Sequence, residues 1–341
     1  MKKNWVLVLI AFAFACSSDK SEEREKIKVA PETLQEVKVN LKLVRLEDEF
    51  FSVKTHEEVK AILLSHPRFV KEYLEVPDAA QQPRFLNDIF QLYSNPQLKA
   101  FYQDNQKFYG DFSDEKNQMA SLFRHVKHFY PNYYVPEVNT IISGFRFDKD
   151  FSFSDSLIVV SIDYFLGKNA RYRPQFYDYM LRRYEKPYIV PMMALAISSK
   201  YNEFNAKDET LLANMIHYGK AHYFLERTMP ELPDSMNIQY TAEELKEANE
   251  NIDVIWGHFI EKKLFYETNN KVIQRYVGES PKTVTIGDKC PGRIGRWLGW
   301  MIVRKYMEEN PGVSLPQLMK ESNAQELLKK SKFKLKSDKK S

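Results

Sequence analysis

Residues 156–162 read Ser-Leu-Ile-Val-Val-Ser-Ile and residues 138–142 read Val-Asn-Thr-Ile-Ile, and these two β-branched and aliphatic runs decide the fold class. A Phe-rich and Asp-rich turn region separates them, so the pattern predicts two paired strands. Nearer the N-terminus, alternation with polar residues predicts a further β-element that contains Val37, Val39, Leu41 and Leu43. The chain should therefore carry a small sheet in its middle.

Helical patterns occupy most of the remaining chain. Thr55 and Glu58 form a capping-box pattern that opens a helix ending near Pro67. Further amphipathic helices are expected at about 84–94, 97–109, 114–130 and 191–200. Thr241 and Glu244 cap another helix start, whose apolar spacing continues to Leu264. The sequence thus predicts an α+β fold, a mostly helical single domain with a small central β-sheet.

Two longer helices follow the predicted strands. The first begins at Asp208 and Glu209, and we expect it to lie against the sheet. Its apolar stripe consists of Leu212, Met215, Ile216, Gly219 and Tyr223. The second opens at Pro291 and runs to about Glu309. Gly295 and Gly299 lie on one face of that helix, where they allow another backbone to approach closely.

The N-terminus has the pattern of a secretory signal. Lys2 and Lys3 precede a purely apolar run over residues 5–15. About ten apolar residues cannot cross a hydrocarbon core roughly 30 Å thick. We therefore expect residues 1–15 to be a signal peptide, and no other stretch approaches transmembrane length.

The signal ends at a cysteine in a lipobox-like context. Ala13-Phe14-Ala15-Cys16 is similar to a lipoprotein signal and predicts lipid on Cys16, whereas ordinary cleavage near Ala15 would leave Cys16 free. Ser17 stands where Asp signals inner-membrane retention in other bacteria, which favours the outer membrane. Residues 16–30 are then the lipidated cysteine and a flexible tether. Residues 31–330 form the globular domain, and residues 331–341 form a Lys-rich tail.

Composition and charge limit the classes of function. With 43% hydrophobic and 14% aromatic residues, the chain can bury a large core. Loss of the two lysines in the signal lowers the formal net charge from +4 to about +2, which gives no electrostatic footprint for nucleic acid. Cys290 is then the one remaining thiol, which we interpret as a partly buried structural cysteine.

The most suggestive chemistry lies on the helix around His217. A zinc protease needs Glu after the first His and a second His four positions on, but these places hold Tyr218 and Ala221. An atypical metal site of His217, His258 and Glu261 is the alternative, if two helices bring them together. Lys220, one turn from His217, is expected to be an ion-pair partner. No cofactor is predicted.

Other residues are candidates for a binding pocket. Asp163, at the end of an apolar strand and next to Tyr164, is the best candidate for a buried carboxylate. Arg293 and Arg296 are placed in the first turn of the Pro291 helix, beside Trp297, where they could bind an anion or an acidic partner. Structural salt bridges are the alternative role for the two arginines.

Three separated blocks resemble one family. They are Ser161 to Gly167, the helix Met215 to Lys220 with its exit Pro230 to Asp234, and Pro291 to Trp300 followed by Ile302-Val303-Arg304. In this order the blocks resemble the gliding-motility lipoprotein GldB family of Bacteroidetes.

The resemblance implies a lipid-anchored envelope component of gliding motility, coupled to the type IX secretion system, whose partners are other proteins of those machineries. A small sheet followed by a His-bearing helix also resembles a predicted zinc-protease family, which would make the core a degenerate, zincin-like one. Two functions are therefore expected as alternatives. The first is a non-catalytic binding or scaffold protein, and the second is an envelope metal-dependent hydrolase with an atypical site.

Overall fold

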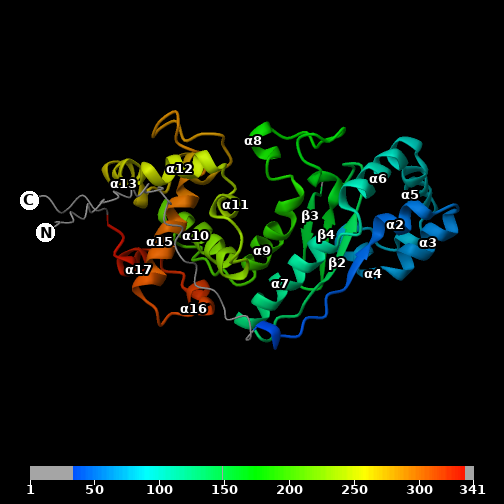
Figure 1. Cartoon of the computed structure of the whole chain (residues 1–341), viewed down its shortest axis with the longest axis horizontal. Coiled ribbons are helices and arrows are strands. Elements are labelled where there is room, and N and C mark those ends of the chain that lie inside the picture. Colours follow the sequence, from blue (N-terminus) through cyan, green and yellow to red (C-terminus); the bar gives the residue numbers. More distant parts are fainter. Residues whose placement is uncertain (1–33, 148, 335–341) are drawn as a thin grey trace, which may run out of the picture.

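The computed structural model describes residues 34–147 and 149–334. Its ribbon is elongated, with N-terminal helices at one end, a small sheet near the middle and C-terminal helices at the other end (Figure 1). The predicted signal peptide, Cys16 and the tether up to residue 30 lie outside the described residues, as does the tail from residue 335 onward. Over the described ranges, no helix combines the length and apolar character needed to cross a bilayer.

The sheet has four strands in the order β1-β2-β4-β3. The strands are β1 (Leu43–Arg45), β2 (Glu137–Ile141), β3 (Phe151–Phe153) and β4 (Leu157–Ser161). β2 pairs in parallel with both β1 and β4, with Val138 opposite Ile158, and β3 pairs antiparallel with β4. The predicted pairing of the two central runs is confirmed, and the fold is α+β, as the sequence predicted.

The sequence was wrong about the ends of this sheet. Of the alternating residues at 37–43, Leu43 alone lies in a strand, because β1 pairs with β2 over three residues only. Val39 and Leu41 instead pack, half-buried, against the main core. The supposed turn region contains β3, which forms a tight hairpin with β4 through Ser154, whose backbone N–H donates to Leu157 O.

The two faces of the sheet belong to two hydrophobic clusters. Val138, Ile158 and Val160 point into the larger cluster, which extends through the C-terminal helices. Ile141, Leu157 and Val159 point into a smaller cluster with the N-terminal helices. Every residue of β4 is buried, as expected for a strand covered on both faces.

Helices cover the N-terminal side. They are α2 (Leu46–Ser52), α3 (His56–Ser65), α4 (Pro67–Phe69), α5 (Pro83–Ser94), α6 (Pro96–Tyr109) and α7 (Ser113–Phe129), with a π-helical turn at Val70–Leu74 and a 3₁₀ turn at Ala79–Gln81. The predicted capping box is present at Thr55 and Glu58. The other helices predicted before residue 130 are confirmed within one residue at each end.

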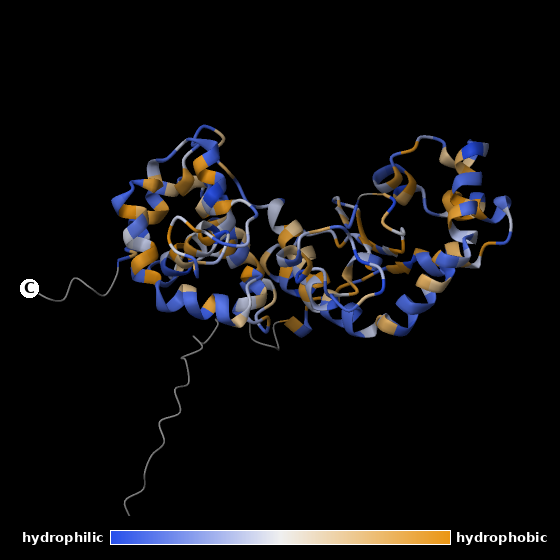
Figure 2. Ribbon diagram, turned by 90° about the horizontal axis from the view of Figure 1, so that it is seen from above, coloured by the Kyte–Doolittle hydropathy of each residue, from blue (hydrophilic) through white to orange (hydrophobic). Residues whose placement is uncertain are grey.

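The C-terminal side is built almost wholly of helices. They are α8 (Asp178–Leu181), α9 (Ile189–Ser199), α10 (Leu211–Thr228), α11 (Asp234–Ile238), α12 (Ala242–Glu250), α13 (Ile252–Glu261), α14 (Asn270–Val277), α15 (Ile294–Glu309), α16 (Leu315–Lys320) and α17 (Ala324–Ser331), with 3₁₀ turns η3 (Ile162–Phe165), η4 (Lys186–Tyr188) and η5 (Leu264–Tyr266). Viewed from above, the two groups of helices form two arms on either side of the sheet region (Figure 2).

α10 and α15 form the most extensive helix pair. A Cβ atom on Gly299 would overlap the carbonyl oxygen of Met215, and one on Gly219 would overlap the carbonyl group of Gly299. The close backbone approach predicted for this face is confirmed. The sequence predicted that α10 lies against the sheet, and this prediction is wrong. α10 packs against α15 and α9, and α9 in turn contacts β3.

Three predicted helix boundaries are wrong. The helix expected to begin at Asp208 and Glu209 begins at Leu211, because Thr210 caps it by accepting a hydrogen bond from Ala213 N. The last long helix begins at Ile294 rather than Pro291, because Pro291 pairs with Lys282 in a β-bridge and Arg293 adopts a left-handed backbone with φ of 57°. The helix capped by Thr241 and Glu244 has its capping box but ends at Glu250, and after Asn251 a second helix, α13, begins at Ile252.

Candidate functional site

The carboxyl ends of the parallel strands β2 and β4 meet at one edge of the sheet, the place where ligands bind in many open sheets. Asp163 follows β4 there and is fully buried. Its Oδ2 accepts hydrogen bonds from Ser143 Oγ and Phe145 N, both at 3.3 Å. Its Oδ1 has no partner among the described residues. Burial raises the pKa of Asp163 to about 6, against these hydrogen bonds.

A second buried carboxylate, missed by the sequence reasoning, follows β1. Glu47 is fully buried; it accepts hydrogen bonds from Thr140 Oγ1 at 2.9 and 2.7 Å and pairs with Arg45 Nε at 2.9 Å. Burial raises the pKa of Glu47, although its hydrogen bonds act the other way. Its position directly after a short strand is the signal that could have identified it.

Tyrosine hydroxyls connect the N-terminal helices to the same strand ends. Tyr93 OH donates to Ile142 O at 3.2 Å, and Tyr109 OH donates to Ile162 O at 2.7 Å. Tyr164, a predicted pocket residue, packs its ring edge-on against Phe145, 5.0 Å between centroids, and is itself buried. These groups hold the helices on the sheet, and the one side-chain hydroxyl that the described residues bring to the Asp163 carboxylate is that of Ser143.

Lys220 is buried inside the C-terminal helices. Its ammonium donates to three backbone carbonyl oxygens, those of Glu203 at 2.8 Å, Met319 at 3.1 Å and Glu321 at 2.7 Å. Burial lowers its pKa to about 8. The predicted ion pair is therefore wrong: Lys220 ties the end of α16 and the loop before α10 to α10.

The alternative metal ligands do not come together. His217 packs edge-on against Phe204, and His258 Nε2 lies 2.9 Å from Tyr276 OH. Within the described part of the chain, no three His, Cys, Asp or Glu side chains lie close enough to hold a metal ion. Cys290 is buried, and burial raises its pKa to about 12, which fits the structural role expected for it.

Arg293 and Arg296 belong to a cluster of three arginines around one glutamate. Arg183 makes a two-pronged contact with Glu279, with both N–O distances 3.0 Å. Arg296 Nη1 lies 3.4 Å and Arg293 Nε 4.0 Å from the same carboxylate. The arginines hold the pKa of Glu279 below its usual range, although burial opposes this shift. The structural salt bridges that the sequence left as an alternative role are thus present, and three guanidinium groups share the single carboxylate of Glu279.

The arginines of this cluster are packed as well as paired. Arg293 is 4% exposed and donates to the side chain and carbonyl of Gln239, while burial lowers its pKa to about 10. Arg296 lies over the Tyr218 ring, 4.2 Å from its centroid. Trp297 is fully buried beside them.

The comparisons with known proteins give a family. A family model described as gliding motility protein GldB matches residues 26–335, most of the chain. The chain belongs to the GldB family. No curated protein and no solved structure matches it significantly. The family connects this chain with gliding motility, and its designation as a lipoprotein family fits an association with the cell envelope.

In this GldB-family chain the predicted site residues fall into separate groups. Asp163 and Tyr164 lie at the strand ends, and His217 and Lys220 lie on α10. Arg293 lies at the start of α15, with Arg296 and Trp297 in its first turn. The structure adds Glu47, Arg183 and Glu279, which sequence patterns did not single out, since Arg183 and Glu279 are 96 residues apart.

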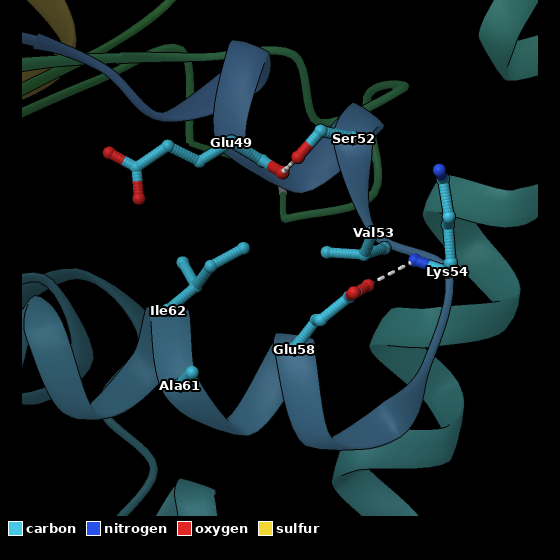
Figure 3. A pocket seen from close by; sticks show the side chains of 7 residues that line it. All are labelled: Glu49, Ser52, Val53, Lys54, Glu58, Ala61 and Ile62. Carbon is cyan, nitrogen blue, oxygen red and sulfur yellow. Dashed lines mark hydrogen bonds between the residues drawn. The ribbon is translucent and has the colours of Figure 1, made fainter.

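One surface depression is a shallow groove of about 460 Å³ between α2 and α3. Val53 and Ile62 point into it from opposite sides, and Glu58 turns back to accept a hydrogen bond from Lys54 N (Figure 3). Glu49 pairs with His66 at 2.8 Å. Glu58 thus serves the cap of α3, and Glu49 serves a local ion pair.

A second groove, of about 260 Å³, lies beside the strand ends. It is lined by Pro96, Gln97, Ala100, Phe101, Arg171 and Tyr172. Phe101 connects this groove to the surroundings of Asp163. The Phe101 ring lies 5.4 Å from the Tyr172 ring and 5.9 Å from the ring of Phe145, whose backbone N–H donates to Asp163. This groove therefore combines aromatic walls with one cation.

Proposed function

We propose that this chain is a lipid-anchored component of the gliding-motility machinery of the cell envelope that acts by binding other proteins rather than by catalysis. The match to the GldB family over residues 26–335 carries the proposal. The lipobox-like pattern at Cys16 supports the anchor, which we place in the outer membrane. Coupling to type IX secretion is part of the same proposal, drawn from the family resemblance.

The contacts of the conspicuous polar residues support a binding role. Lys220 donates hydrogen bonds to three carbonyl oxygens, and Arg293 contacts Gln239 and Glu279. Glu47 accepts a hydrogen bond from Thr140 and forms an ion pair with Arg45. Such groups stabilise a fixed scaffold, whereas catalysis needs groups that converge on a reacting atom. Binding needs only a shaped surface, which the groove lined by Phe101 and Tyr172 supplies.

A gene deletion and a Cys16→Ala variant test the proposal. We expect the deletion strain to lose spreading on agar and to secrete less type IX cargo. The Cys16→Ala protein should leave the membrane fraction after a high-salt wash, because lipid chains supply the membrane affinity. Unchanged spreading of the deletion strain would overturn the motility role, and a Cys16→Ala protein that stays with the membrane would overturn the lipid anchor.

A further inference from the structure

The segment from Gly167 to Glu185, which we name the α8 segment, projects from the body of the molecule beside the strand ends (Figure 1). We propose that the α8 segment and the adjoining groove at Phe101 form a docking surface for an acidic segment of a partner protein that also carries apolar side chains. The inference rests on the proposed binding function and names the surface and the chemistry of the partner.

The base of the α8 segment is fixed. Gly167 N donates to Tyr184 O at 3.1 Å, which closes the segment into a loop, and Tyr184 OH donates to Asp150 Oδ2 at 2.6 Å. Ion pairs secure its second half, from Arg182 to Glu244 at 2.6 Å and from Arg183 to Glu279 at 3.0 Å. A loop held in this way loses little conformational entropy when it binds a partner.

The outer part of the α8 segment exposes aromatic rings. Tyr172 is 42%, Phe176 37% and Tyr177 75% exposed, within six consecutive positions. Isolated exposed apolar residues are ordinary, but three large rings together on one projecting loop are not. Tyrosine and arginine are also the residue types that carry most binding energy in protein interfaces.

The same surface carries an excess of positive charge, with Asp178 as the one exposed acidic residue of the described α8 segment. Lys168, Arg171 and Arg173 are exposed and form no ion pair with any described residue, in contrast to Arg182 and Arg183 at the base. Arg171 lies against Tyr172, with its guanidinium carbon 5.3 Å from the ring centroid. Of the described residues that line the adjoining groove, none is acidic. This charge pattern is complementary to carboxylates of a partner.

The groove favours a protein segment over a lipid surface. Its volume of about 260 Å³ and its walls of Phe101 and Tyr172 suit one or two apolar side chains, while Arg171 at the rim suits a neighbouring carboxylate. Exposed rings beside arginines would also suit a bilayer interface, so the groove, which a flat membrane surface cannot fill, decides for a protein segment.

The binding test uses the purified full-length mature protein and an array of synthetic 12-residue peptides that vary in the number of Glu residues and in the presence of Phe or Leu. We expect saturable binding that requires both the Glu residues and an apolar Phe or Leu in the peptide. The double variant Arg171→Glu, Arg173→Glu should weaken this binding at least about tenfold. Tyr172→Ala should also weaken it. The matched controls are Lys262→Glu with Lys263→Glu and Tyr266→Ala, which change another exposed basic and aromatic surface on a different part of the molecule.

The outcomes separate the alternatives. Loss of binding in the α8 variants, with both controls unchanged and all variants folded by circular dichroism, supports the proposal. Binding that no α8 variant weakens, equal losses in the controls, or no binding by any acidic peptide overturns it. Binding to vesicles of phosphatidylglycerol and phosphatidylethanolamine that the Arg171→Glu, Arg173→Glu variant alone loses would assign the surface to lipid and also overturn it.

Strains separate this inference from the proposed function. A non-motile deletion strain that is fully rescued by the α8 variant leaves the motility role standing and overturns the docking surface. A deletion strain that still glides overturns the motility role itself. Membrane levels of each variant, measured on the same cells, exclude loss of the protein as the cause.

Discussion

The crossing of α10 and α15 makes a sharp prediction about stability. Gly299→Ala adds a Cβ that would overlap the carbonyl oxygen of Met215, a backbone atom that cannot rotate away. The two helices must separate by on the order of 1 Å, which weakens the dispersion contacts along the most extensive helix pair of the molecule. The gain in helix propensity, about 1 kcal/mol, is smaller than this loss.

We expect Gly299→Ala to lower the free energy of unfolding by about 3 kcal/mol, the upper part of the range for overpacking. At roughly 2 °C per kcal/mol for a chain of this size, the melting temperature falls by about 6 °C. Gly295→Ala should cost less, because its Cβ would lie 3.0 Å from Tyr276 O and needs only a small adjustment. Equilibrium urea unfolding of the mature protein measures the series.

Gly257→Ala is the matched control. Gly257 lies inside α13, and no atom of the described residues lies within 4 Å of the Cβ that alanine would add there. The exchange should stabilise the protein by about 0.5–1 kcal/mol through helix propensity alone. The reasoning fails if Gly299→Ala is as stable as the parent protein, or if Gly257→Ala loses as much stability as Gly299→Ala.

Three further predictions concern charge and metal. Glu279→Gln should reduce the urea unfolding free energy by on the order of 1–2 kcal/mol, since three arginines lose their shared carboxylate; no loss would show that solvent already compensates them. The folded pKa of Asp163 is raised from 3.8 to about 6, so its contribution favours folding at low pH and is lost as pH rises through this window, by up to about 3 kcal/mol. Asp163→Asn should therefore flatten the fall in unfolding free energy between pH 4 and 6, and an unchanged slope would contradict the assignment. The purified protein should carry no stoichiometric zinc and cleave no peptide; about one zinc per chain, lost together with motility in His217→Ala, would favour the hydrolase.

Local signals predicted most of the helices. The capping boxes at Thr55 and Thr241 identified two helix starts, because a cap is a contact between residues three apart. The two glycines on α15 correctly indicated a close backbone contact, but not with which element. Met215 supplies that contact from α10, so the partner of a packed face depends on the whole chain topology.

The errors arose where long-range contacts decide the local structure. β1 is short because its pairing with β2, 95 positions along the chain, ends after three residues. Pro291 looked like a helix start, yet its bridge to Lys282 delays the helix to Ile294. Lys220 looked like an ion-pair partner, yet two of its three acceptors are the backbone carbonyl oxygens of Met319 and Glu321.

The second and third of the three blocks that carry the family resemblance are packed against each other in the structure. Arg304 from the third block pairs with Asp234, at the end of the second block, at 2.7 Å, and with Glu226 on α10 at 2.7 Å. Trp300 Nε1 donates to the same Glu226 at 3.0 Å. The resemblance therefore rests on residues that build the α10 and α15 pair. Residues that recognise a partner need exposure instead, and the first block ends at Gly167, where the exposed α8 segment begins. Changes in that segment should consequently alter binding without altering the stability of the helix pair, a separation that the α8 and Gly299 variants measure directly.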